Sequence, residues 1–307
     1  MRNAPILVVS REETTVLAVL SRFGEGAAQA LEEGRIFVGK RRATASDQVR
    51  AGDEIWLYPA RDLPREPPRI LFEREGVVAV YKPPDMATVA DHRGSAGSLE
   101  GVVSQMLGGR APIAATSRLD VGVSGVVLFA TDDVSRRALT RAREEGRYWR
   151  HYVAISTSAP DPLRGLWTGT IGRAGDPRLR RVGGPSAVVA ETAYAVAASA
   201  PKGALLAVEP KTGRTHQIRV HAAHAGCPLW GDGAYGGPTR LVAGNGTVAP
   251  VGRIALHAAW VEVKLGAKTH LRVESPPPPD FTAIWTACGG DLSSFAGALS
   301  PIYPITQ

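Results

Sequence analysis

Cysteines and long apolar runs are scarce in this chain, and each of these scarcities excludes a class of protein. Of 307 residues only two are cysteine, Cys227 and Cys288, which excludes a disulfide framework and favours a reducing compartment. No apolar run approaches the ~20 residues that span a bilayer, so no membrane partner is expected. The opening apolar stretch, Pro5 to Val9, is too short for a secretion signal. We therefore expect a cytoplasmic protein.

The composition is that of a globular protein with an excess of positive charge. Hydrophobic residues make up 44% and charged residues 21%, which excludes disordered and fibrous chains. There are 36 Lys and Arg against 29 Asp and Glu, so the net charge is +7, and most of these cations are arginine. A basic balance favours polyanionic partners, nucleic acid above all, and the planar fork of arginine suits phosphate.

The first 60 residues have the features of a small separate unit. Apolar spacing predicts helices at Val16–Leu20 and Ala27–Glu33, with short strands at residues 35–38 and 55–58. This order, with "LEEGRIFVGKRRA" before "RAGDEI", resembles the S-four-type RNA-binding module, which holds structured RNA. Such modules usually carry basic residues on the second helix, where this chain has glutamates. RNA binding, and a shape kept with little RNA binding, both stay open.

Proline content divides the rest of the chain. The stretch "RDLPREPPR" at 61–69 predicts an extended linker. A larger domain is expected at 70–287, with a weakly ordered tail at 288–307. The four prolines at 276–279 are expected to mark the end of the core.

Strands outnumber helices in the larger domain. One helix is predicted at Val134–Glu145, where Thr131 to Asp133 can cap its first turn and Gly146 can end it. The strand candidates are Val77–Tyr81, Val126–Ala130, Tyr152–Ile155, Leu205–Pro210, Ile254–Lys264 and His270–Val273. They do not alternate regularly with helices, so we expect an α+β fold with a mixed or antiparallel central sheet.

Two stretches contain more polar residues than their apolar flanks require. The first, "SRLDVGVSG" at 117–125, places an arginine and an aspartate beside glycines that allow close backbone approach to a ligand. The second, "TGRTHQIRVH" at 212–221, follows a predicted strand, and Thr215 is a candidate N-cap for a helix ending near Ala225. A turn with a surface ion pair and an ordinary basic helix start are the simpler readings of each stretch alone.

Together, and in this order, the two stretches resemble the signatures of RluA-type pseudouridine synthases. "SRLDVGVSG" is similar to their H-R-L-D-x-x-T-S-G, and "GRTHQIRVH" with "GDGAYG" is similar to G-R-T-H-Q-I-R-x-H with G-D-x-x-Y-G. "VVAVYKPPDM", "RYWRHYVAI" and "RIALHA" also match family segments in the expected order, with Arg150 in place of a lysine. The resemblance covers roughly Ile70 to Trp285.

This resemblance implies an enzyme that isomerises uridine in structured RNA, ribosomal or transfer, without a cofactor or a metal. It implies that Asp120 is the nucleophile, that Arg118 helps to flip the target uridine out of its stack, that Tyr152 stacks on the base and that Arg219 pairs with the aspartate. These roles fit the physics, since a nearby arginine favours an ionised carboxylate and chemistry on a stacked base requires extrusion. Nothing in the sequence fixes the oligomeric state, and a monomer is expected.

Two positions depart from the family signature. Ser117 stands where histidine is usual, and Val123 stands where threonine is usual. Serine keeps a hydrogen-bonding group and valine loses one. Because neither position supplies the nucleophile, we expect the loop geometry and the substrate range to be affected more than the reaction class.

Three other functions compete with this reading. The first is a zinc site, built from His216, His221, His224 and Cys227, which a helix would not bring to one face. The second is a hydrolase, but Ser124 lies in G-x-S-G and not G-x-S-x-G, and Asp91 with His92 reads as a surface loop. The third is a non-catalytic RNA-binding or ribosome-assembly protein. Its basic surface would comprise Arg136, Arg137, Arg141, Arg143, Arg147, Arg150, Arg178, Arg180 and Arg181.

Overall fold

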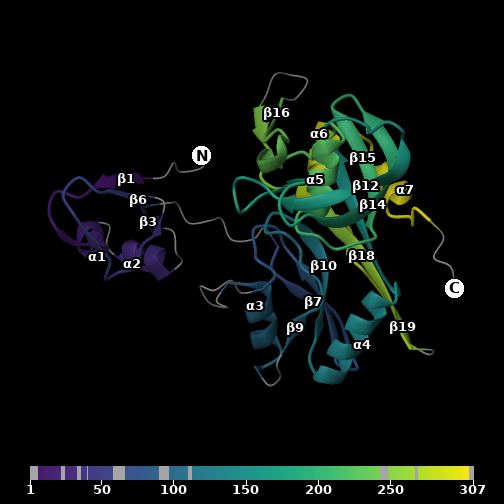
Figure 1. Ribbon diagram of the computed structural model, residues 1–307, viewed down its shortest axis with the longest axis horizontal. Coiled ribbons are helices and arrows are strands. Elements are labelled where there is room, and N and C mark those ends of the chain that lie inside the picture. Colours follow the sequence, from purple (N-terminus) through teal and green to yellow (C-terminus); the bar gives the residue numbers. More distant parts are fainter. Residues whose placement is uncertain are drawn as a thin grey trace. The chain divides into compact units, whose positions relative to one another are not determined.

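The protein consists of two compact units. The computed structural model describes residues 6–21, 25–32, 36–39, 41–57, 66–89, 97–109, 113–242, 248–266 and 269–303. Contacts within the chain separate Met1–Arg65 from Glu66–Gln307, and Figure 1 shows both units in sequence colours. None of the described helices is long and apolar enough to cross a membrane.

The first unit combines a small sheet with two helices. Strands β1, β6, β3 and β4 are antiparallel neighbours in that order, and β2 pairs with β5. The elements are β1 Ile6–Val9, β2 Thr14–Thr15, α1 Val16–Leu20, α2 Glu25–Glu32, β3 Ile36–Val38, β4 Arg41–Arg42, β5 Gln48–Val49 and β6 Glu54–Leu57. Their shared core comprises Val8, Val16, Leu20, Ala27, Ala30, Ile36, Ala43, Val49 and Ile55.

The predicted elements of this unit are present. The helix Val16–Leu20 is confirmed, and the Thr15 side chain caps it by accepting a hydrogen bond from the Ala18 N–H. Helix α2 begins two residues before the predicted start, at Glu25. Glu33, Arg35 and Tyr58, which the predictions included, lie outside the described residues.

The second unit is built on one large mixed sheet. Its strands run in the order β13-β12-β14-β15-β11-β18-β10-β8-β7, with β19 beside β18 and β9 beside β10. Described neighbours are antiparallel except β10 and β18, which are parallel. The strands are β7 Arg69–Arg74, β8 Val77–Lys82, β9 Ala114–Ala115, β10 Ser124–Ala130, β11 Tyr148–Ser156, β12 Arg164–Arg173, β13 Arg180–Val182, β14 Val188–Ala200, β15 Gly203–Pro210, β18 Leu256–Leu265 and β19 Thr269–Glu274. The mixed sheet confirms the predicted α+β class.

Helices cover both faces of the sheet. On one face Leu139 of α4 packs with Val126 and Leu128, while on the other Val103 of α3 packs with Val127. Because both faces are covered, every residue of β10 is buried, which explains its unbroken apolar run. The helices are α3 Leu99–Met106, α4 Asp133–Glu144, α5 Gln217–His224, α6 Pro279–Ala287 and α7 Phe295–Ala298, with 3-10 turns η2 Gly233–Tyr235 and η3 Leu292–Ser294.

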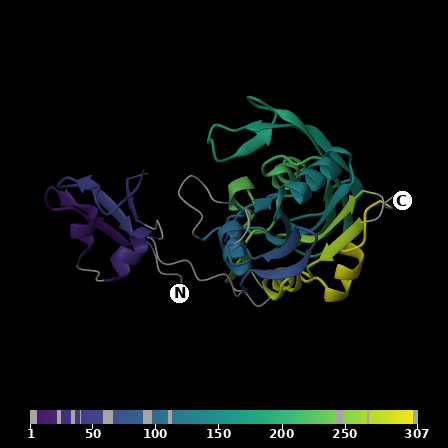
Figure 2. The same cartoon turned by 90° about the horizontal axis from the view of Figure 1, so that it is seen from below.

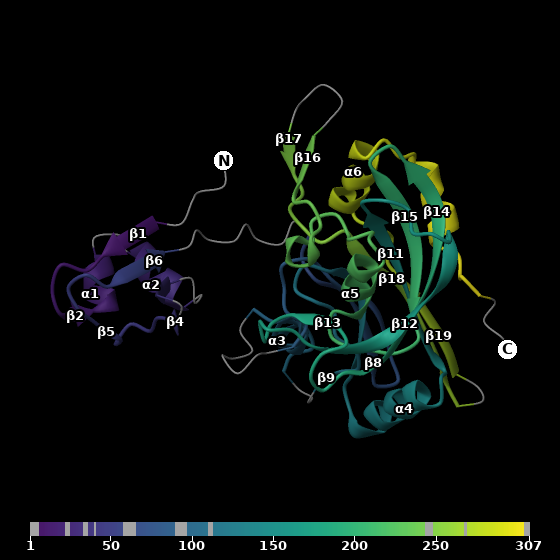
Figure 3. The ribbon, with the colours of Figure 1, turned by 45° about the horizontal axis from the view of Figure 1, so that its top comes forward.

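Most predicted strands of this unit are present, but the sequence did not indicate all of its elements. The predicted helix at 134–145 is α4, capped by the Asp132 carboxylate, which accepts from the Ser135 N–H. Strands β12 and β14 were not predicted, because they lie where the sheet is half-exposed and their patterns are rich in glycine, alanine and threonine. A further hairpin, β16 Arg240–Val242 with β17 Val248–Pro250, projects from the unit (Figure 3).

The prediction that the core ends at the four prolines, with a weakly ordered tail after Cys288, is wrong for the described residues. Phe281 and Trp285 of α6 are fully buried, and Phe295 of α7 packs in the same core. Figure 2 shows these C-terminal helices, in yellow, against the unit. Buried polar side chains fasten them: His151 Nε2 donates to the Ala298 carbonyl at 2.7 Å. The prolines lead into α6, because proline is tolerated in the first turn of a helix.

One glycine allows the parallel contact beside the site. Gly125 has φ = 124°, and a Cβ atom there would overlap the Ala258 main chain. Only glycine lets β10 approach β18 at this register. This contact fixes the start of β10, which follows directly after the loop that carries Asp120.

Candidate active site

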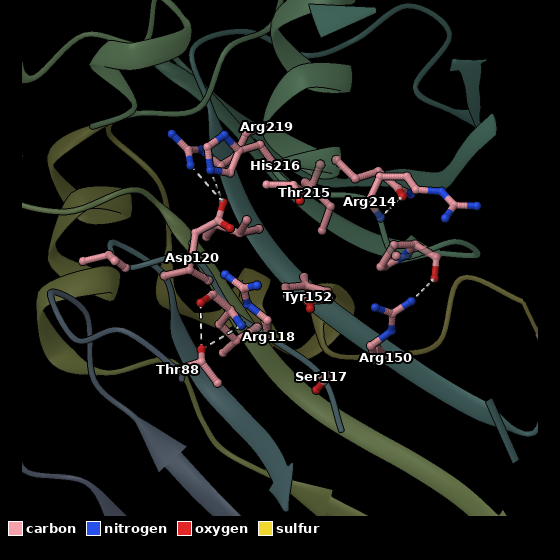
Figure 4. Close-up of a pocket in the computed structure, with 18 of the residues that line it drawn as sticks. Thr88, Ser117, Arg118, Asp120, Arg150, Tyr152, Arg214, Thr215, His216 and Arg219 are labelled. Atoms are coloured by element: carbon pink, nitrogen blue, oxygen red, sulfur yellow. Dashed lines mark hydrogen bonds and ion pairs between the residues drawn. The ribbon is translucent and has the colours of Figure 1, made fainter. Parts of the chain in front are cut away.

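One cleft collects the residues that the sequence singled out. It has a volume of about 710 Å³ and is lined by Arg118, Asp120, Tyr152 and Arg219, together with neighbours from β11, the loop before β10 and the start of α5. Figure 4 shows these side chains directed into a common space. Residues about 100 positions apart in sequence therefore share one site.

Hydrogen bonds on both sides hold the loop around Asp120. The Thr88 hydroxyl donates to the Leu119 carbonyl at 2.8 Å and accepts from the Leu119 N–H at 3.0 Å. On the other side the Val121 carbonyl accepts from the Asp85 N–H at 2.7 Å and from Lys82 Nζ at 3.3 Å. Asp120 thus projects from a fixed backbone, and its side chain remains 24% exposed to the cleft.

Arg219 lies between two carboxylates. Its Nε and Nη2 atoms donate to the two oxygens of Asp232 at 2.7 and 2.8 Å, and its Nη1 donates to Asp120 Oδ2 at 2.8 Å. Asp232 is 1% exposed, so this bidentate pair is buried and fixes the plane of the guanidinium. These two carboxylates raise the pKa of Arg219 despite its burial. We call Asp120, Arg219 and Asp232 the ion triad.

A histidine and a tyrosine border the ion triad. His216 Nδ1 is hydrogen-bonded to the Tyr235 hydroxyl at 2.7 Å, and its Nε2 lies 3.9 Å from Asp120 Oδ2. Burial lowers the pKa of His216. His216 has φ = 58°, an unusual backbone for a non-glycine residue, which occurs mainly where surrounding structure enforces it. The Tyr235 ring lies under the Arg219 guanidinium, 4.8 Å from centroid to Cζ.

Arg118 and Tyr152 contribute an exposed cation and a buried ring. Arg118 is exposed in the cleft and has no hydrogen bond or ion pair with any residue in the described part of the chain. Tyr152 is 6% exposed, and burial raises its pKa. A β-bulge between His151 and Tyr152 shifts the pairing of β11 with β18 at this point.

One prediction about the second signature is wrong. Thr215 is not the N-cap of α5: the cap position is His216, in a left-handed conformation, and the helix begins at Gln217. The Gln217 side chain instead binds the preceding loop, accepting from the Thr212 hydroxyl at 2.7 Å and from the Arg214 N–H at 2.9 Å. Hydrogen bonds to the Gln217 side chain therefore close the loop before α5. Rules based on N-cap propensity do not consider this role for a glutamine.

The residues of the competing functions have other surroundings. His221 is buried and hydrogen-bonded to the Thr192 hydroxyl at 2.9 Å, and Cys227 lies in the apolar core. Across the described ranges, no three His, Cys, Asp or Glu side chains are grouped to hold a metal. Ser124 is fully buried and hydrogen-bonded to His257 and Arg253, and it does not line the cleft. Asp91 and His92 lie outside the described residues.

Sequence reasoning assigned no role to several residues that complete the site. Asp232 and Tyr235 belong to the "GDGAYG" motif, and His216 belongs to "GRTHQIRVH", so their signals were present. Their contacts with Arg219 join segments that only the fold brings together. Of the two departures, Ser117 is buried with its hydroxyl 3.4 Å from that of Tyr148, and Val123 is a core residue.

Known proteins resemble this chain in sequence and in fold. The family described as RNA pseudouridylate synthase matches residues 76–224. The RNA pseudouridine synthase YjbO of Bacillus subtilis is 30% identical over 70% of this chain and 74% of its own length. Ribosomal large subunit pseudouridine synthase D of Xylella fastidiosa is 30% identical over 86% of this chain and 84% of its own.

A solved structure shares the fold. Human RNA pseudouridylate synthase domain containing 1 is superimposed with a TM-score of 0.57 at 21% identity, covering 76% of this chain and 95% of that one. The sequence relatives, the family match and the shared fold lead to one conclusion. This chain belongs to the RNA pseudouridine synthases of the RluA type.

Proposed function

We propose that this enzyme isomerises specific uridines in ribosomal RNA and that Asp120 is the nucleophile. The observation that carries the proposal is the ion triad, in which a buried, bidentate Asp232–Arg219 pair presents one N–H to Asp120 at the cleft. Ribosomal RNA is the first candidate because relatives such as the Xylella fastidiosa protein are named for the large ribosomal subunit.

The reaction rearranges atoms within one nucleotide. The Asp120 carboxylate adds to the sugar or to the uracil ring, and the bond between the sugar and ring nitrogen 1 breaks. The base rotates and rejoins the sugar through carbon 5, and the bond to Asp120 breaks so that the carboxylate is regenerated. Carbon 5 then loses its proton while nitrogen 1 gains one. No electron is gained or lost and no water is consumed, so the balanced reaction has no redox partner.

The other cleft residues support the uridine in this scheme. Tyr152 offers a buried ring on which an extruded base can stack. Arg118, which has no ion-pair partner among the described residues, can occupy the gap left in the RNA stack. Arg219 holds the Asp120 oxygen and compensates its charge. Each role depends on a different contact, so each can be tested by a separate substitution.

The N-terminal unit is included in the proposal as an RNA-binding module of the S-four type, joined by a linker near residues 61–69. Its helix–strand order and independent core support an autonomous module. We also propose that the enzyme acts in the cytoplasm, where ribosomal RNA is available.

The test is a pseudouridine map of total RNA from cells with and without this gene. A site that disappears on deletion, and returns with the wild-type gene but not with Asp120→Asn, would support substrate, reaction and nucleophile together. The purified enzyme must then form pseudouridine in a synthetic transcript of the same region. An active Asp120→Asn variant would contradict the mechanism, and purified protein that binds this transcript without converting it would favour a non-catalytic RNA-binding protein.

A further inference from the structure

Three arginines line the cleft apart from Arg118 and the ion triad. Arg143 comes from α4, Arg150 from β11 and Arg214 from the loop before α5. In Figure 4 the labelled Arg150 and Arg214 lie beyond Tyr152 as seen from Asp120. We propose that this arginine cluster (Arg143, Arg150 and Arg214) is a subsite for a backbone phosphate of the RNA beside the target uridine, an inference that rests on the proposed function.

The arginine cluster lacks acidic partners in the described structure. No member of the arginine cluster has a carboxylate within 4.0 Å among the residues described. Each guanidinium is positioned by a main-chain carbonyl instead. The acceptors for Arg143, Arg150 and Arg214 are Thr116, Thr212 and Val189, at 3.0, 2.8 and 3.0 Å respectively. These contacts fix the side chains without neutralising them.

Neighbouring arginines of α4 show the contrast. Arg136 pairs with Asp133 at 2.9 Å, and Arg141 pairs with Glu145 at 2.7 Å. Both are solvent-facing pairs three or four residues apart. Arg143 lies on the same helix, two residues after Arg141, and lines the cleft with no carboxylate partner among the described residues. Two outer arginines of the helix are therefore paired with acids, whereas the arginine at the cleft has no acidic partner in this part of the structure.

Two members of the cluster converge on one point of the backbone. A Cβ atom at Gly213 would overlap Arg143 Nη2 and would lie 3.3 Å from Arg150 Nη1. Partial desolvation, together with the nearby charges of Arg150 and Arg214, lowers the pKa of Arg143. Guanidinium groups held this close repel each other, and an anion bound between them would attract each one and offset this repulsion.

The anion that fits is a phosphodiester. A guanidinium carries five N–H donors, and the carbonyl contacts above use one of them in Arg143 and one in Arg214. Arg150 Nε is buried without a partner in the described structure. The planar fork matches two phosphate oxygens at once. Among the described lining residues Asp120 is the sole acid against five arginines, so the cleft attracts a polyanion.

The test measures salt-dependent binding of a fluorescein-labelled 12-mer oligouridylate to the full chain. Arg143→Gln and Arg214→Gln remove one cluster cation each, and Arg141→Gln is the matched control from the outer face of α4. We expect each cluster variant to weaken binding about tenfold. We also expect the slope of log affinity against log salt to become shallower by about 0.7, the value for one lost phosphate contact on a single strand. Arg141→Gln should change neither value.

Each outcome decides the proposal. Equal effects of Arg143→Gln and Arg141→Gln would overturn it, because the enzyme would then sense overall charge only. An unchanged salt slope in both cluster variants would also overturn it. If Arg143→Gln fails to fold, Arg214→Gln still decides, and Arg150→Lys, which keeps the charge, should keep the wild-type slope. An active wild-type enzyme with unaltered slopes refutes the subsite alone, whereas altered slopes without pseudouridine formation refute the proposed function alone.

Discussion

The ion triad and the arginine cluster use the same side chain in opposite ways. In the ion triad, Arg219 lies between two carboxylates, which balance its charge inside the protein. Among the described residues, the guanidiniums of the arginine cluster hydrogen-bond only to main-chain carbonyls, so their charge remains available to a ligand. We propose from this comparison that one cleft separates two tasks: holding the reacting carboxylate and holding the RNA strand.

Removing the proposed nucleophile should have the largest effect on this comparison. Asp120→Asn keeps the size of the side chain but cannot attack, so we expect pseudouridine formation to fall by at least about 10⁴-fold. RNA affinity should change little, because the arginine cluster is intact. Single-turnover assays and binding titrations measure the two quantities. The control is Asp133→Asn, an exposed acid on α4, which should retain activity.

Removing the central cation should damage folding as well as chemistry. Arg219→Gln leaves Asp232 buried and uncompensated, so the free energy of unfolding should decrease by roughly 3–5 kcal/mol. Arg136→Gln, which breaks an exposed pair, should lower it by less than about 1 kcal/mol. Urea unfolding of both variants provides the measurement. Equal losses would mean that the buried pair has no special structural role.

Lowering the pH should destabilise the buried residues behind the Asp120 loop before it affects the arginine cluster. His257 Nε2 donates to the Ser275 carbonyl, and its Nδ1 accepts from Ser124, which follows the Asp120 loop. Burial lowers the pKa of His257 to about 3. Below its unfolded pKa of about 6.5 the unfolded chain binds a proton that the folded chain does not, so stability falls as the pH falls toward 3.

The expected slope from His257 is about 1 kcal/mol per pH unit between pH 6 and 4. Unfolding titrations across this range should show a shallower dependence in His257→Asn than in wild type. His224→Gln, at an exposed position, should keep the wild-type slope. A wild-type slope in His257→Asn would show that other groups control acid sensitivity.

A single methyl group at the centre of the arginine cluster should produce the smallest effect. Gly213→Ala would push against Arg143 Nη2, the flexible end of a long side chain, so the arginine can yield. We expect RNA affinity to fall by roughly two- to fivefold, less than 1 kcal/mol. Gly226→Ala, at a position with open space but positive φ, is a control for backbone strain without displacement of Arg143. Unchanged affinity in Gly213→Ala would place the phosphate away from this glycine.

The sequence predicted the parts of the fold that depend on local pattern. The buried runs of β8 and β10 and the capped helix α4 were visible as apolar stretches and a capping aspartate. The packing of α6 and α7 was not predicted, because contacts such as His151 with Ala298 join residues 147 positions apart. A run of prolines gives no signal that the chain after it returns to the core.

Some features of the site were likewise predictable from the sequence and others were not. The resemblance of the ordered motifs to the family signatures predicted that Arg219 pairs with Asp120, and the structure places the two side chains in contact at 2.8 Å. The anchoring of Arg219 by Asp232 and the unusual backbone of His216 depend on three-dimensional contacts that no spacing rule encodes. The sequence marked Arg143 as part of a basic surface, and Arg150 both as part of that surface and as the replacement of a lysine. That they lack acid partners among the described residues appears only in the structure.

The most direct test compares single-turnover pseudouridine formation against RNA concentration for wild type, Asp120→Asn and Arg143→Gln, using the transcript identified by the map. The division of tasks requires that the Arg143→Gln curve shift to higher RNA concentration, whereas the Asp120→Asn curve stays at the baseline throughout. Measurable conversion by Asp120→Asn, or a baseline curve for folded Arg143→Gln at every concentration, would contradict it.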